Sequence, residues 1–173
     1  MEYWFKKAGY KGHPNGFDFE VAEKYGCCFW EPRDSTYRTR IYFGAKPRDL
    51  RIGDILIQEI SSCRSVQESA VIGVFKCVSE FKLAEDGFGP HVGEWDKGKW
   101  KNYIDVENLT PKFGSDAKKS LEQNQQTRLY LKEEWKKLKY GKFPYVHRGW
   151  AKIEADKAKK IIEKIECIEK QLT

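Results

Sequence analysis

The chain has 173 residues, of which 40% are hydrophobic and 34% charged, and it carries a formal net charge of +6. This length and composition suit one globular domain over residues 1–173 and exclude an intrinsically disordered chain. No apolar run approaches the roughly 20 residues needed to span a bilayer, so we expect no membrane partner.

Alternating and helical patterns predict several elements in the first half of the chain. Tyr3–Lys7 alternates with the period of a strand. After a glycine-rich loop, Phe17–Tyr25 is predicted to be a short helix that ends at Gly26. Residues 49–54 are predicted to form a tight turn that leads into a strand at residues 55–60. Residues 70–78 are predicted to form a second strand that is buried on both faces. These two strands are expected to pair as a hairpin with a long connection.

The second half contains the clearest helical pattern. Tyr103–Val106 and Trp150–Ile153 are predicted strands, and residues 115–138 a weakly patterned helix. Residues 155–172 are predicted to form an amphipathic helix. Its apolar positions follow helical spacing: Ala158, Ile161, Ile162, Ile165, Ile168 and Leu172. The order of these elements favours one α+β domain with an amphipathic C-terminal helix.

The sequence does not support catalytic or metal chemistry. His13, His91 and His147 are far apart and match no local metal-ligand spacing. The neighbouring Cys27 and Cys28 follow a predicted helix C-terminus, where the helix dipole disfavours a thiolate, so buried small cysteines are the preferred interpretation. We therefore expect no enzyme activity, no cofactor and no metal. The odd count of five cysteines and the absence of a signal-peptide pattern at Met1 indicate a cytoplasmic protein.

Two stretches combine tryptophan with cations and are interpreted as loops. In the first, Trp30 precedes six basic residues: Arg33, Arg38, Arg40, Lys46, Arg48 and Arg51. In the second, Trp95 and Trp100 alternate with Lys97, Lys99 and Lys101. Cations neutralise phosphates, and an indole face stacks on a base for roughly 1–3 kcal/mol. The alternative is that each tryptophan only caps the core, as is expected for Trp4, Trp135 and Trp150; two basic loops together favour nucleic-acid binding.

The order of the motifs resembles the EVE and YTH domains of the PUA-like superfamily. The resemblance lies in YWFKK at residues 3–7, GCCFW at 26–30, LRIGDILI at 50–57, VIGVFKCV at 71–78, and HRGWAKI at 147–153 before the last helix. It covers most of the chain, but residues 86–145 match only loosely. It implies a PUA-like curved mixed sheet or partial barrel flanked by helices.

The resemblance also implies a function. Such domains hold a modified base in an aromatic cage; by position, Trp30 is one wall and Trp95 or Trp100 a second, while Lys7 matches a lysine that contacts the nucleotide. Arg33, Arg38, Arg40, Lys97, Lys99 and Lys101 are the expected contacts to the nucleic-acid backbone. Ala8 and Gly9 replace the polar residues that follow the lysine in YTH domains, which argues against reading N6-methyladenine in RNA.

Several interpretations stay open at this stage. The favoured one is non-catalytic recognition of a methylated base, with DNA preferred to RNA. In a related interpretation, the chain resembles the N-terminal recognition domain of archaeal McrB-type restriction systems. A motor domain or a nuclease subunit would then be a further partner. The others are an RNA binder without preference for modification, and a hydrolase of a modified nucleoside that uses Lys7 or a cysteine.

Overall fold

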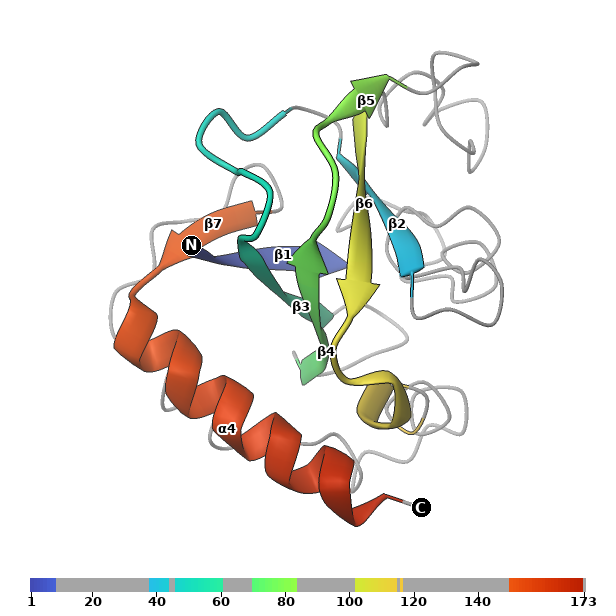
Figure 1. Cartoon of the computed structure of the whole chain (residues 1–173). Helices are drawn as coiled ribbons and strands as arrows, with labels where there is room; N and C mark the ends of the chain where they lie inside the picture. The colour runs from blue at the N-terminus through green and yellow to red at the C-terminus, as the bar shows by residue number, and fades with distance from the viewer. Residues whose placement is uncertain are drawn as a thin grey trace, which may run out of the picture.

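The computed structural model describes residues 1–8, 38–43, 46–60, 70–83, 102–114, 116 and 150–172. In these ranges the chain forms one sheet and a long C-terminal helix, an α+β arrangement (Figure 1). The elements are β1 (Tyr3–Ala8), β2 (Arg38–Phe43), β3 (Ile55–Ile60), β4 (Ala70–Cys77), β5 (Lys82–Leu83), β6 (Asn102–Asn108), β7 (Trp150–Ile153) and α4 (Ala155–Gln171). The strands lie in the order β2-β6-β4-β3-β1-β7, and β5 pairs with β6.

The sheet is mixed and open. Strand β1 runs parallel to β3, whereas every other strand pair is antiparallel. Within the described ranges, the outermost strands β2 and β7 do not pair with each other, so the sheet does not close into a barrel. The expectation of an α+β domain with a mixed sheet and a C-terminal helix is confirmed.

The sheet is also strongly curved. Lys6 on β1 places its ammonium 5.3 Å from the centre of the Phe43 ring on β2, although β3, β4 and β6 lie between these strands. In a flat sheet, four steps of about 4.8 Å would separate the strands by roughly 19 Å. Trp4 of β1 belongs to the same buried cluster as Ile41 and Phe43 of β2. The face that carries these residues is therefore concave.

Most predicted elements in the described ranges are confirmed. Strands β1, β3, β6 and β7 and helix α4 occupy the predicted positions to within one or two residues at their ends. The predicted hairpin is the antiparallel pair of β3 and β4. In β4 Val71, Gly73, Val74 and Phe75 are buried, and Lys76 after them is exposed. The helices predicted at residues 17–25 and 115–138 lie outside the described residues, apart from Asp116.

One interpretation is wrong. Arg38 and Arg40 were assigned to a basic loop, but both lie in strand β2. The physical reason is visible in the alternation: Ile41 and Phe43 are both buried, and they are two positions apart as a half-buried strand requires. The positive charge of this segment concealed its strand pattern.

The turn before β3 is built from one glycine and one aspartate. Gly53 has a φ of 88°, a backbone conformation that side chains rarely adopt, although no atom would obstruct a side chain there. Asp54 follows it and is buried. Its carboxylate accepts hydrogen bonds from the backbone N–H groups of Glu2 and Arg51 and from the indole of Trp4. Asp54 therefore forms a hydrogen bond within the turn, to Arg51, and connects the turn to the start of the chain through Glu2 and Trp4.

Helix α4 supplies the second buried layer. Ala158, Ile161 and Ile165 are buried, while Ile162, Ile168 and Leu172 are half-buried, so the predicted apolar stripe faces the protein. Figure 1 shows α4 running from the end of β7 to the helical turn that follows β6. Glu169 accepts hydrogen bonds there from the backbone N–H groups of Lys112 and Phe113. In the described part of the chain, no helix is long and apolar enough to cross a membrane.

Candidate functional site on the concave face of the sheet

A row of side chains that carry buried polar atoms crosses three neighbouring strands. Lys6 of β1 lies beside Gln58 of β3 on one side and beside Trp150 of β7 on the other. Because side chains alternate between the two faces of a strand, these residues share the concave face with Trp4. Lys6 is only 2% exposed and Gln58 is 0% exposed. We call Gln58, Lys6 and Trp150 the polar row.

The polar row borders an apolar one. Two residues earlier on β1 and β3 are Trp4 and Leu56, and Phe75 of β4 lies beside Leu56. All three belong to the buried core. At the level of Gln58, β4 carries Gly73, and the register of β3 against β4 shifts directly after Gln58. Irregularities of this kind often occur beside functional sites, because they redirect side chains.

The two tryptophans of this face differ in their hydrogen bonds. The rings of Trp4 and Trp150 meet edge to face at 6.1 Å. The indole N–H of Trp4 donates to Asp54 Oδ2 at 3.2 Å. The indole N–H of Trp150 is also buried, but the part of the chain that the structure describes offers it no acceptor. A buried polar group in this state needs an explanation, because leaving it unpaired costs about 1–3 kcal/mol.

A basic turn lies between β2 and β3. Lys46, Arg48 and Arg51 are all exposed, whereas Leu50 between them is buried. Arg51 donates from its guanidinium to the backbone carbonyls of Arg48 and Leu50, which stiffens the turn. Lys46 places its ammonium 5.5 Å from the centre of the Phe81 ring. The turn therefore presents three cations on a fixed backbone, together with the exposed Ile52.

The residues predicted for the site fall into two groups. Trp30, Arg33, Trp95, Lys97, Lys99, Trp100 and Lys101 lie outside the described residues. Lys7, Arg38 and Arg40 lie in strands: Lys7 is beside Glu59, Arg38 opposite Glu107 and Arg40 opposite Asp105. Each of these three cations therefore has an acidic residue at its cross-strand position, which lowers the net positive charge of the surrounding sheet.

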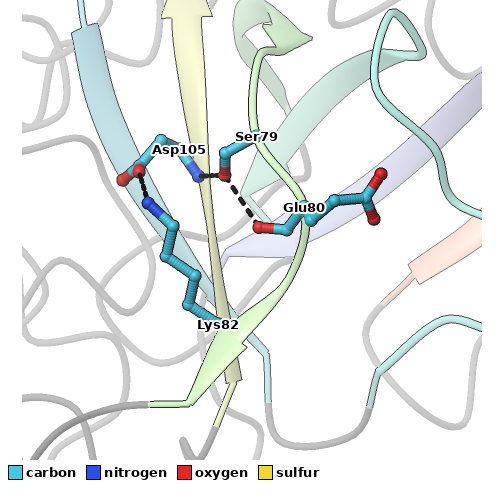
Figure 2. Close-up of polar contacts among 4 residues, drawn as sticks. All are labelled: Ser79, Glu80, Lys82 and Asp105. Atoms are coloured by element: carbon cyan, nitrogen blue, oxygen red, sulfur yellow. Dashed lines mark hydrogen bonds and ion pairs between the residues drawn. The ribbon is translucent and has the colours of Figure 1, made fainter.

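Asp105 also anchors the connection between β4 and β5. Figure 2 shows its backbone N–H donating to Ser79 Oγ at 2.9 Å and its carboxylate paired with Lys82 at 2.9 Å. The Ser79 hydroxyl in turn donates to the Glu80 carbonyl. This carboxylate is committed to a structural contact, and it stands at the register position of Arg40. The polar contacts of Figure 2 thus belong to the scaffold.

The polar row was not found from the sequence. Its only signal was the alternation of β1, which places Lys6 on the same side as Trp4. Gln58 and Trp150 come from strands 52 and 144 residues further along the chain, and their positions beside Lys6 depend on the strand order. Trp150 was expected to be structural, and its contact with Trp4 agrees with that expectation.

Comparison with known proteins does not identify the chain. No protein-family model and no curated protein matches it. Among solved structures, the X-ray crystal structure of Protein PSPTO5229 from Pseudomonas syringae is 16% identical in sequence. The match covers 94% of this chain and 99% of that chain, with a TM-score of 0.41. A likeness at this level carries no inference about fold family or function.

Proposed function

We propose that this domain binds nucleic acid without catalysing a reaction, and that it recognises a methylated base, with DNA favoured over RNA. The base is flipped into a cage formed by Trp30 with Trp95 or Trp100. Those three residues lie outside the described residues, so the cage rests on the sequence. The finer fold, a PUA-like sheet, belongs to the same proposal and is supported by the curved, open, mixed sheet with its C-terminal helix.

The observation that carries the proposal is the basic turn before β3. Lys46, Arg48 and Arg51 are exposed together, and the only exposed carboxylate between them is that of Asp49. The buried Asp54 holds the backbone of the turn in place, so little backbone freedom is lost when a polyanion binds. Three exposed cations on one short turn suit the regular phosphates of a nucleic-acid backbone. The chain's net charge of +6 acts in the same direction.

Base flipping requires both the aromatic cage and the cations of the basic turn. Extruding a base from a duplex costs a few kcal/mol. A methyl group buried between indole rings returns only about 0.8 kcal/mol, so phosphate contacts must offset the remainder. We therefore expect that loss of the cage removes the preference for methylation, whereas loss of the cations weakens binding to every sequence.

Fluorescence anisotropy with matched duplexes tests the proposal. The probes carry one 5-methylcytosine, one N6-methyladenine or no modification. Wild type should prefer one methylated probe, and Trp30→Ala should bind all three alike. Arg48→Gln should reduce the slope of log affinity against log salt by about 0.9, whereas Lys159→Gln on the exposed side of α4 should leave it unchanged.

The other outcomes separate the alternatives. A steep salt dependence without preference for methylation would indicate an RNA or non-specific binder, to be checked with single-stranded RNA of the same sequence. Release of a product from a modified nucleoside would indicate the hydrolase. Absence of binding to any of these probes at 50 mM salt would overturn the proposal.

A further inference from the structure

Ile52 is an apolar side chain that lies exposed among the cations of the basic turn. It follows Arg51 directly, and 55% of its surface is exposed. Lys46 and Arg48 are exposed in the same segment between β2 and β3. Exposed aliphatic side chains are common on protein surfaces when they occur singly, so exposure alone does not indicate a binding role. The backbone and the charges around Ile52 distinguish it.

The backbone at Ile52 is held by hydrogen bonds on both sides. The N–H of Asp54 donates to the carbonyl of Arg51 at 3.1 Å, and Gly53 between them has a φ of 88°. A four-residue turn with a positive φ at its third residue is a type II turn, and Ile52 occupies the second position. The N–H of Gly53 also donates to the carbonyl of Cys77 at the end of β4, at 2.8 Å. The side chain of Ile52 therefore stands on a backbone that is fixed before any partner binds.

The side chain of Arg51 is directed back along the turn. Its Nη1 donates to the carbonyl of Arg48 at 2.7 Å and to that of Leu50 at 3.2 Å. A guanidinium has five N–H groups, so the three on Nη2 and Nε can still bind a phosphate. Ile52 thus has a positioned cation directly before it in the chain.

We propose that Ile52 enters the base stack of a DNA duplex as an apolar wedge and kinks the duplex. The cations of the basic turn bind the phosphates beside the opened step. This inference rests on the proposed function for its partner and adds how that partner is deformed. Aliphatic side chains that insert between base steps unstack them and bend the duplex by about 20–90°. A step that is already unstacked releases its base at a lower cost, so the wedge would assist base flipping.

The other exposed aliphatic residues of the described ranges lack this combination. Met1 is the first residue of the chain, and Leu109 has no charged residue next to it in the sequence. Leu83 follows Lys82, but the ammonium of Lys82 already forms an ion pair at 2.9 Å. In the part of the chain that the structure describes, Ile52 alone joins exposure, a fixed turn and several exposed cations.

A membrane is the other partner that offers apolar and anionic contacts together. Even a myristoyl chain gives only marginal binding to a bilayer, and one isoleucine side chain is far smaller. A base step, in contrast, accommodates a single side chain. A duplex is therefore the partner that this surface favours, and anionic vesicles belong to the test.

Energy transfer between the two ends of a duplex measures the bend. Short duplexes, methylated and unmodified, carry a donor dye at one end and an acceptor dye at the other. Saturating wild type should raise the transfer efficiency to that of a bend of about 20–90°. Ile52→Ala should remove the bend and weaken binding roughly 3- to 30-fold. It should leave the salt slope unchanged, because no charge is removed, and Ile52→Leu should keep the bend.

Three variants serve as controls. Leu109→Ala removes an exposed aliphatic side chain outside the basic turn and should keep both the bend and the affinity. Arg48→Gln should weaken binding and lower the salt slope, yet keep the bend when the protein is saturating. Trp30→Ala should also keep the bend, because the wedge acts separately from the cage. Since Ile52 is exposed, Ile52→Ala should unfold at the same urea concentration as wild type, which excludes loss of the fold.

The outcomes distinguish this inference from the proposed function. If duplexes bind with a preference for methylation, but without a bend or with one that persists in Ile52→Ala, the wedge is wrong and the proposed function stands. If the bend depends on Ile52 while methylated and unmodified duplexes bind alike, the wedge stands and methyl recognition is wrong. If no duplex binds at low salt, both are wrong. Binding to phosphatidylserine vesicles that is lost in Ile52→Ala would then identify the turn as a membrane contact.

Discussion

The indole N–H of Trp4 donates to the carboxylate of Asp54, which lies 50 residues later in the chain and 3.2 Å away. The same carboxylate accepts the backbone N–H of Glu2 at 2.7 Å and that of Arg51 at 3.0 Å. One buried side chain therefore connects β1 to the basic turn and to the start of β3. The position of the exposed cations relative to the concave face depends on this connection.

Replacement of Asp54 should destabilise the protein strongly. Asp54→Ala leaves three donors without their acceptor, and we expect a loss of about 3–5 kcal/mol in the free energy of unfolding. Asp54→Asn keeps one acceptor oxygen and should cost less. Asp49→Ala, an exposed carboxylate in the same turn, should change stability by less than about 0.5 kcal/mol. Urea unfolding of the three variants measures this, and equal stability of Asp54→Ala and Asp49→Ala would contradict it.

Cys77 should make stability dependent on pH in alkaline solution. Burial, and secondly the negative charge of Asp54, raise the pKa of its thiol from 9.0 to about 12. A folded-state pKa above the unfolded value means that the unfolded chain loses the proton first. The contribution is thus fully present below pH 9 and is lost as the pH rises towards 12, by about 1.4 kcal/mol per pH unit.

The difference between wild type and Cys77→Ala isolates this effect. Other groups titrate in both proteins and cancel, so the stability advantage of wild type over the variant should be constant up to pH 8 and shrink by pH 10.5. An advantage that stays constant over that range would show that the thiol ionises equally in both states. Mass mapping after iodoacetamide treatment at pH 8 should in addition find the exposed Cys167 modified before the buried Cys77.

The elements were predictable where apolar residues recur with the regular spacing of a strand or a helix. Strands β1, β3 and β7 and helix α4 have alternating or helical apolar patterns that depend only on neighbouring residues. Strand β2 was missed because four of its six residues are polar or tyrosine, and the count of arginines outweighed the alternation of Ile41 and Phe43. Strand β5 has two residues, too few to show any period.

The candidate site was not predictable because it depends on strand order. No local pattern says that β1 lies between β3 and β7, yet this order alone brings Gln58 and Trp150 to the two sides of Lys6. Asp54 belongs to a turn that was predicted, but its burial follows from Trp4 reaching it across the structure. The aromatic cage of Trp30 with Trp95 or Trp100 remains a prediction.

Even a methyl group in place of the hydrogen of Gly73 should destabilise the protein. A Cβ at this position would lie 2.9 Å from two atoms of the Phe75 ring, and Phe75 is fully buried. Because the ring is fully buried and cannot turn out into solvent, Gly73→Ala should cost about 1–3 kcal/mol of stability. The double variant Gly73→Ala with Phe75→Leu should recover part of what the two single changes lose together. Strict additivity in thermal unfolding would show that the ring is not the obstacle.

Glu169 should control how firmly the end of α4 is attached. The hydroxyl of Thr110, which precedes the helical turn at residues 111–114, accepts a hydrogen bond from the backbone N–H of Val74, so it is already engaged in binding β4. Glu169 of α4 accepts the N–H groups of Lys112 and Phe113 instead, and its charge also suits a helix N-terminus. Glu169→Gln should therefore weaken this attachment by about 1–2 kcal/mol.

Amide hydrogen exchange can localise the effect of this change. In Glu169→Gln, exchange at Lys112 and Phe113 and in the last turn of α4 should become roughly 5- to 30-fold faster, which corresponds to the expected loss of free energy. Amides of Ile57 and Val74 in the centre of the sheet should exchange only as fast as the change in global stability requires. Glu166→Gln, an exposed residue one helical turn earlier, serves as the control and should alter neither region. If both variants loosen the end of α4 equally, helix charge rather than the contact with residues 112 and 113 holds it in place.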